Sequence, residues 1–350
     1  MPSLPNISES DVPDEPTNGN STDDSHEIHS DVSSELEEIL PAERPAYFRT
    51  EFSRLFHSHG DLPYPLPCDA PELERQNVFH RVLQQVLGSN FVGPVHAVLA
   101  SDTGERGIKA LDIGNGNGIW LEEMSEQFPH VKFHGIDIVP VSSRTPPRNV
   151  DFEMHNMNEA LRRTSGTMSF VHARSIDMAV TNYPALLNEV ARILRPGGLF
   201  LSGEWSWGPT FQDGARRNTN PIPAIDSFVT WITDELYARN HIAPAGAHVH
   251  EWLSESGQFI DISETLEYCI PLDHNTDTRT ANIGTDFRNA WRWYADSLLP
   301  FMRSTGMAED RVAEMNRGYM RELDATPGLV AVYTVTYATK SLRGPLVAGR

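Results

Sequence analysis

Several features that sort proteins into classes are scarce in this chain of 350 residues. It holds only two cysteines, Cys68 and Cys269, and two distant cysteines form neither a disulfide framework nor a zinc-site spacing. No apolar run is long enough to span a membrane, and the N-terminus lacks the basic and then apolar pattern of a secretory signal. These absences predict an intracellular, cytoplasmic protein with no membrane partner.

Positive charge is also scarce. The chain has 28 Lys and Arg residues against 48 Asp and Glu residues, which gives a formal net charge of −20. Nucleic-acid binding needs a basic surface, so this balance argues against nucleic acid as the main partner. Residues 1–40 contain no Lys or Arg and few large apolar residues. Such a segment cannot bury enough surface to offset the entropy lost on ordering, so we expect a disordered acidic tail there.

The strongest positive signal lies between Ile108 and Trp120, where a short apolar run ends in Asp112 and is followed by alternating glycines. This pattern predicts a strand, a tight turn and a helix. Glycine allows sharp turns that bring backbone N–H groups close to a ligand, and the helix N-terminus that follows favours negative charge. The D-x-G-x-G-x-G spacing differs from the G-x-G-x-x-G loop of dinucleotide enzymes, which disfavours a nicotinamide oxidoreductase. The glycines alone leave open a turn that binds nothing.

A second carboxylate supports a ligand site. The segment 131–138 predicts the next strand, with Asp137 near its end. An acidic residue about 20 positions after the glycines is where a βαβ nucleotide site places its ribose-binding carboxylate. Asp112 and Asp137, one strand apart, therefore suit a ligand that has ribose hydroxyls and a cationic amino acid tail.

Strand and helix patterns alternate along the rest of the chain. The predicted strands cover 108–113, 131–137, 150–154, 169–173, 199–205, 259–268 and 330–338. The predicted helices cover 73–87, 118–128, 182–194, 225–237 and 285–323, and apolar residues between 44 and 56 also recur at helical spacing. This alternation indicates an α/β fold with a doubly wound parallel sheet.

The run from Asp112 to Gly118 resembles the first motif of class I S-adenosylmethionine-dependent methyltransferases. Further segments resemble a fungal group that includes the LaeA-type regulators of secondary metabolism and enzymes of natural-product clusters. These segments are Tyr64-Pro65-Leu66-Pro67-Cys68-Asp69, Val171-His172-Ala173-Arg174 and Val190-Ala191-Arg192-Ile193-Leu194-Arg195-Pro196-Gly197-Gly198. The resemblance implies S-adenosylmethionine as cofactor. It also implies a Rossmann-like seven-stranded sheet whose antiparallel last strand lies beside the fifth, with N-terminal helices and a helical cap insertion.

The resulting domain plan has five parts. It comprises a disordered acidic tail (1–40), an N-terminal helical lid (41–106), a cofactor-binding core (107–205), a helical cap with strand six and the acceptor pocket (206–327), and the last core strand with its tail (328–350).

Seven residues are predicted to bind the cofactor: Asp112, Gly114, Gly116, Gly118, Asp137, Asn156 and Met157. At one position the chain departs from the family, because His155-Asn156 replaces the usual acidic pair after the third strand. The Asn156 amide can still accept from the adenine amino group and donate to a ring nitrogen.

Methyl transfer from a sulfonium is an in-line displacement that requires alignment rather than a metal. The spacing in His248-Val249-His250-Glu251 is a weak metal signal, so we predict no metal site. A hydroxyl acceptor would profit from a general base, and His172 is the first candidate, with a purely structural role as the alternative. His155 and His250 are weaker candidates as bases. Trp205, Trp252 and His250 are predicted to line the acceptor pocket.

We therefore predict a methyltransferase that O-methylates a small molecule of fungal secondary metabolism. The alternative is a LaeA-like regulator of the same fold, nuclear in location, that acts through protein partners. The sequence does not indicate an oligomeric state.

Overall fold

The computed structural model describes residues 36–60, 62–100, 107–140, 146–212, 221–273 and 283–342. Most of the predicted acidic tail lies outside the described residues. No described helix combines the length and apolar character needed to cross a bilayer.

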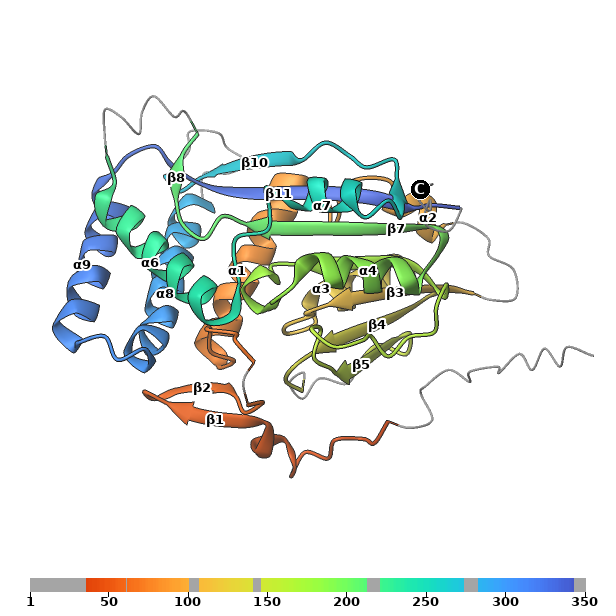
Figure 1. The fold of residues 1–350 in the computed structure, drawn as a ribbon, viewed down its shortest axis with the longest axis horizontal. Coiled ribbons are helices and arrows are strands. Elements are labelled where there is room, and N and C mark those ends of the chain that lie inside the picture. Colours follow the sequence, from red (N-terminus) through yellow and green to blue (C-terminus); the bar gives the residue numbers. More distant parts are fainter. Residues whose placement is uncertain are drawn as a thin grey trace, which may run out of the picture.

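A mixed sheet forms the centre of the molecule (Figure 1); within the described residues, seven strands follow one another across it and two short strands pair at its side. Its order is β10-β11-β7-β6-β3-β4-β5. The strands are β3 (Ile108–Ile113), β4 (Val131–Asp137), β5 (Val150–Met154), β6 (Met168–Arg174), β7 (Leu194–Trp205), β10 (Leu266–Pro271) and β11 (Leu329–Lys340). Strands β3 to β7 run parallel to one another, whereas β11 lies antiparallel between β7 and β10. The predicted fold class, with its antiparallel last strand beside the fifth, is confirmed.

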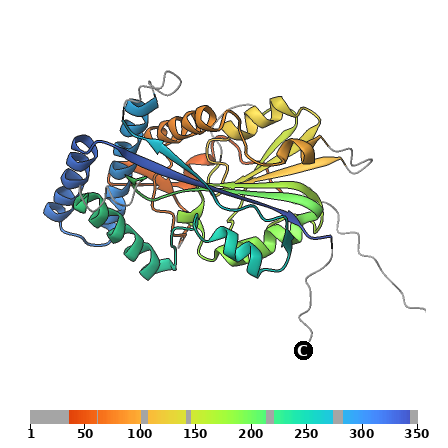
Figure 2. The same ribbon diagram turned by 90° about the horizontal axis from the view of Figure 1, so that it is seen from above.

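Helices cover both faces of the sheet (Figure 2). One face carries α1 (Ala70–Leu87), α2 (Val95–Leu99) and α3 (Ile119–Gln127), and the other carries α4 (Tyr183–Ile193) and α7 (Val249–Glu255). Successive strand residues point to opposite faces, so a strand can contribute to two hydrophobic clusters. In β3, for example, Ala110 joins the cluster with α1 to α3 and Leu111 joins the cluster with α4.

Local chemistry sets the start of α1. The Asp69 carboxylate accepts from the Glu72 N–H at 3.3 Å, and a proline follows in the first turn. Such a cap satisfies one of the backbone donors that a helix N-terminus leaves free. The Arg54 guanidinium donates two hydrogen bonds to the same carboxylate, at 2.6 and 2.8 Å. The helix ends at Gly88, which adopts the left-handed conformation.

Three helices gather at one end of the sheet (Figure 1): α6 (Pro223–Asn240), α8 (Ile283–Ser304) and α9 (Glu309–Ala325). The helical pattern predicted over 285–323 is therefore two helices. They separate near Gly306, whose φ of 86° does not suit a continuing α-helix.

The prediction of helix between residues 44 and 56 is wrong. A single 3₁₀ turn, η2 (Arg44–Tyr47), precedes a hairpin of β1 (Phe48–Glu51) and β2 (Arg54–His57). Its turn residues Phe52 and Ser53 have φ values of 46° and 61°, as two-residue hairpin turns require. Aromatic residues four positions apart fit a strand as well as a helix, because four is also a multiple of two.

The single strand predicted over 259–268 is also wrong. Two strands, β9 (Phe259–Ile260) and β10, pair with β11, as does the short β8 (Thr210–Phe211). Ile260 lies opposite Thr339 and Leu266 lies opposite Val335. The chain therefore advances six residues from β9 to β10 while β11 advances only four between the same two pairs. The residues between them must therefore leave the ladder.

Candidate cofactor and acceptor site

A cavity of about 500 Å³ lies at the carboxyl ends of the parallel strands. Parallel α/β sheets bind ligands at this edge. Its walls come from the segment before α1, from α1 and α8, and from the loops after β3, β4, β5, β6 and β7. The cavity has two parts, a polar half around the glycine loop and an aromatic half near α8.

The glycine loop has a backbone that other residues would strain. Gly114, Gly116 and Gly118 have φ values of 71°, 56° and 80°. A Cβ atom on Gly114 would lie 2.6 Å from Ile176 Cγ2. Gly114 and Gly116 line the cavity, and Gly118 is the residue before α3, so the loop brings a helix N-terminus close to the cavity.

Asp137 ties this loop to the end of β4. Its Oδ2 accepts the Gly116 N–H at 2.8 Å, and its Oδ1 accepts the Ile138 and Val139 N–H groups at 2.7 and 3.3 Å. Burial raises the pKa of Asp137 to about 6, although these hydrogen bonds act in the opposite direction. The carboxyl group lines the cavity beside the loop.

The other predicted cofactor residues lie around the same half of the cavity. Asp112, Asn156 and Met157 line it. His155 lines it too.

His172, the predicted base, is not among the cavity-lining residues. It is buried behind Asp112, with its Nδ1 atom 2.7 Å from Asp112 Oδ1. A general base must come within hydrogen-bond reach of the proton that it removes. The geometry therefore gives the base assignment no support and favours the structural alternative.

Two of the three predicted acceptor-pocket residues lie elsewhere. Trp205 lines the cavity, but Trp252 and His250 do not. Both belong to α7, where Trp252 packs on Tyr183 with ring centroids 5.4 Å apart and the His250 Nδ1 atom lies 2.8 Å from the Ser263 carbonyl oxygen. The helix packs on one face of the sheet instead of covering the strand ends, which corrects their placement.

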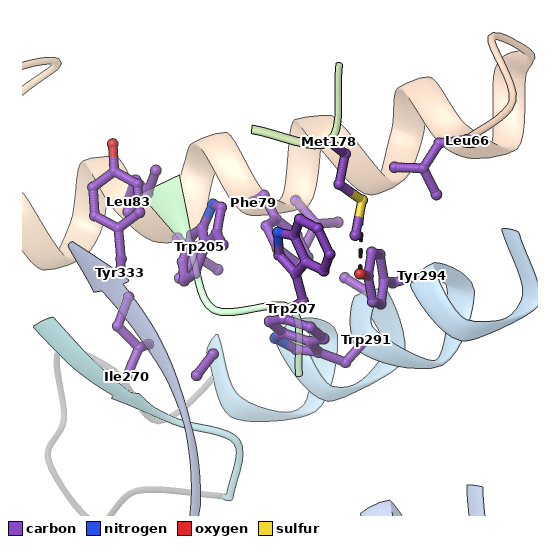
Figure 3. Packing of buried hydrophobic residues seen from close by; sticks show 14 of the residues in the cluster. Leu66, Phe79, Leu83, Met178, Trp205, Trp207, Ile270, Trp291, Tyr294 and Tyr333 are labelled. Carbon is purple, nitrogen blue, oxygen red and sulfur yellow. Dashed lines mark hydrogen bonds between the residues drawn. The ribbon is translucent and has the colours of Figure 1, made fainter. Parts of the chain in front are cut away.

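The aromatic half of the cavity, called here the aromatic chamber, is formed by Phe79, Trp205, Trp207, Trp291 and Tyr294. Figure 3 shows these rings grouped between α1 and α8. The Phe79 ring centroid lies 4.9 Å from that of Trp205 and 5.4 Å from that of Trp291. Only Trp205 was expected from the sequence. Trp291 and Tyr294 lie in the helix predicted over 285–323, but the sequence did not show which residues they would face.

Two buried carboxyl groups adjoin the chamber and were not predicted. Asp177 lines the cavity, and its Oδ2 accepts the Trp207 indole N–H at 2.9 Å and the Ala245 N–H at 3.2 Å. Glu204 lies behind it and accepts from the Ile176 N–H and the Tyr183 hydroxyl. Burial raises the pKa of Asp177 to about 7. Burial also raises the pKa of Glu204, and the nearby Asp177 raises it further.

A paired guanidinium borders the chamber. Arg75 lies 4.7 Å from the Phe79 ring centroid and 5.6 Å from that of Tyr294. Its partner Glu72 is completely buried and also accepts from the Ser297 hydroxyl at 3.0 Å. Within the described ranges, no group of three or more His, Cys, Asp or Glu side chains is arranged to hold a metal.

Comparisons with known proteins identify the class of the domain. Residues 91–257 match a family model described as a methyltransferase domain. The secondary metabolism regulator laeA of Coprinopsis cinerea is 29% identical over 324 residues, which cover 90% of this chain and 78% of that protein. The protein-methionine methyltransferase laeA of Emericella nidulans is 27% identical over 173 residues, 49% of this chain and 44% of that protein.

Among solved structures, the Haemonchus contortus phosphoethanolamine N-methyltransferase 2 in complex with S-adenosyl-L-methionine is similar at 17% identity. The match covers 76% of this chain and 57% of that one, with a TM-score of 0.39. This likeness is too weak to transfer a substrate.

The chain contains a class I S-adenosylmethionine-dependent methyltransferase domain, and S-adenosylmethionine is its cofactor. It is a distant homologue of the fungal LaeA regulators of secondary metabolism. The predicted class and cofactor are confirmed.

Proposed function

We propose that this chain is a regulatory methyltransferase of the LaeA type, whose methyl acceptor is a side chain of a protein. The observation that carries the proposal is the similarity to a LaeA regulator over nine tenths of the chain. The small-molecule O-methylation predicted from the sequence becomes the second candidate.

The polar half of the cavity fits the cofactor. Asp137 would bind the ribose hydroxyls, Asp112 the ammonium group of the amino acid tail, and Asn156 and Met157 the adenine. The glycine loop supports this assignment, because Gly114 and Gly116 line the cavity with φ values of 71° and 56°, which let the backbone approach a ligand closely. When bound, the cofactor supplies an electrophilic methyl group on a sulfonium.

The aromatic chamber suits a thioether acceptor, which is the acceptor named for the Emericella nidulans relative. Sulfur packs favourably against aromatic rings, and a newly formed sulfonium is a cation that their faces stabilise. In this reaction the thioether sulfur forms a bond to the methyl carbon while the bond from that carbon to the cofactor sulfur breaks. No proton is released, so the chain needs no base.

One observation favours the second candidate, a hydroxyl acceptor on a small molecule. Asp177 lines the cavity next to the chamber and has a pKa near 7, so it can hold a proton taken from such a group. The two candidates differ in pH dependence, because only a hydroxyl acceptor needs Asp177 in its ionised form.

Labelling with S-adenosylmethionine that carries a heavy-isotope methyl group tests the proposal. The purified chain and the labelled cofactor are incubated with an extract of the source organism, and mass spectrometry locates the label. We expect label on a protein, and none in a parallel reaction with Asp137→Ala. Label on a single small metabolite would refute the regulatory proposal and establish the second candidate.

A further inference from the structure

Asp112 and His172 form a buried pair behind the glycine loop whose role the proposed function leaves open. Asp112 of β3 and His172 of β6 are register partners in neighbouring parallel strands, so their side chains leave the same face of the sheet. His172 Nδ1 lies 2.7 Å from Asp112 Oδ1. Both residues are buried, with exposed fractions of 3% for His172 and 4% for Asp112. The pair is thus held together by a contact within the protein.

The direction of the hydrogen bond follows from protonation. Burial lowers the pKa of His172, and this effect outweighs the opposing influence of Asp112. The imidazole is therefore neutral and carries one N–H. A carboxylate only accepts hydrogen bonds, so the hydrogen is on Nδ1 and is donated to Asp112. This charge-assisted bond holds one oxygen of a carboxylate that lines the cavity.

Trp120 of α3 holds the imidazole ring in place. The Trp120 and His172 rings stack with centroids 3.9 Å apart and planes inclined by 14°. Trp120 is itself held, because its indole N–H donates to the Asn90 carbonyl at 2.8 Å. His172 does not line the cavity, so it can act on a ligand only through Asp112.

We infer that His172 is a positioning residue, which holds Asp112 in the orientation that binds the ammonium group of the cofactor's amino acid tail. The inference rests on the proposed cofactor contact of Asp112 and is independent of the methyl acceptor. A carboxylate that is already oriented loses little side-chain freedom when the ligand binds, so the hydrogen bond adds to affinity. It does so only for ligands that carry the ammonium group.

Two ligands separate this role from a general effect on the fold. S-adenosylhomocysteine carries the amino acid tail, whereas 5′-methylthioadenosine keeps the adenosine and the sulfur but lacks that tail. Their dissociation constants are measured by calorimetry. His172→Leu removes the donor, and we expect it to weaken S-adenosylhomocysteine roughly 10-fold, the value of a hydrogen bond to a charged group. Binding of 5′-methylthioadenosine should not change.

Replacement of His172 by an amide provides a rescue. His172→Asn places an N–H near the position of the imidazole Nδ1 and should restore most of the lost affinity. His172→Gln places its N–H near the position of Nε2, away from Asp112, and should behave like His172→Leu. If His172→Leu does not fold, the comparison between His172→Asn and His172→Gln provides the test in its place. His134→Leu, on the neighbouring strand β4, serves as the control and should bind both ligands like the wild type.

Equal weakening of both ligands would overturn the inference, because it would assign His172 to the shape of the loop. Unchanged binding of S-adenosylhomocysteine in His172→Leu, or equal behaviour of the Asn and Gln variants, would overturn it as well. A wild-type chain that binds neither ligand would refute the cofactor contacts themselves, whereas a result on the acceptor would leave this test unaffected.

Discussion

The two halves of the cavity are built in different ways. The polar half comes from the turns after neighbouring strands, and its residues lie between Asp112 and Met157 in the chain. The aromatic chamber joins Phe79 of α1, Trp205 and Trp207 at the end of β7, and Trp291 of α8. The first depends on backbone conformation and the second on packing between distant segments.

This difference separates what each half does. A loop with fixed N–H groups and carboxylates binds the same cofactor wherever it occurs, since the contacts are made by backbone and short side chains. A chamber made of large side chains changes its shape with every substitution, so we propose that it selects the acceptor. Variants in the two halves should therefore separate cofactor binding from methyl transfer.

The largest effect is expected for Trp205→Ala in the chamber. Trp205 is buried against Phe79 and against Tyr333, whose ring centroid is 4.8 Å away. Truncation of a buried Trp lowers the free energy of unfolding by about 3–5 kcal/mol. Below its unfolding temperature, this variant should still bind S-adenosylhomocysteine but transfer no label. Chemical denaturation and calorimetry measure both properties, with the half-exposed Trp293→Ala as a control that should change neither.

Asp137→Ala should have the next largest effect, on the other half. It removes the acceptor for three backbone N–H groups and the proposed ribose contact. We expect the affinity for S-adenosylhomocysteine to fall about 100-fold, since hydrogen bonds to a charged group are among the strongest. Asp151→Ala removes a carboxylate on β5 whose side chain is 59% exposed, and its affinity should match that of the wild type. Unchanged binding in Asp137→Ala would refute the ribose assignment.

Gly114→Ala tests the close approach in the loop. Its Cβ would lie 2.6 Å from Ile176 Cγ2, in addition to the strain of a φ of 71°. Gly166→Ala is the matched control, because its φ is 70° but no atom lies within 4 Å of the added Cβ. Each variant should lose about 1–2 kcal/mol of stability from backbone strain, and Gly114→Ala should lose more. Equal losses would show that the contact with Ile176 relaxes freely.

The smallest expected effect is a pH dependence at Asp177. Its pKa is raised from 3.8 to about 7, so between these values the folded state binds more protons than the unfolded state. Stability contributed by this group therefore falls as pH rises from about 4 to about 7. Asp177→Asn removes this loss, so its melting temperature relative to the wild type should rise by about 2 °C or more between pH 5 and pH 8.

Histidines with lowered pKa values, such as His57 and His134, change stability in the opposite direction with pH. They are present in both proteins of the Asp177 comparison, so their contribution cancels in the difference. The same comparison with the exposed Asp151→Asn should show no trend with pH. A flat difference for Asp177→Asn would mean that the neighbouring carboxyl groups of Asp177 and Glu204 together take up no additional proton on folding in this range.

Local patterns in the sequence were sufficient for the strands and the glycine loop. The predicted strands 108–113, 131–137 and 150–154 agree with the structure, because buried parallel strands are short apolar runs bounded by turn residues. The hairpin of β1 and β2 was missed, since short aromatic segments fit both the helical and the strand period. The split between β9 and β10 was missed because it depends on the register against β11.

The sequence by itself determined the class of the domain and its cofactor through motifs that resemble those of a known family. The spacing along neighbouring turns was enough to place Asp112 and Asp137 at one site. Only the tertiary structure decided that His172 lies behind Asp112, that α7 carries Trp252 and His250 away from the cavity, and that Asp177 adjoins it. Only the tertiary structure brought Trp291 and Tyr294 to face Phe79. The physical reason is that these relations are contacts between segments far apart in the chain, which side-chain packing fixes and local periodicity does not encode.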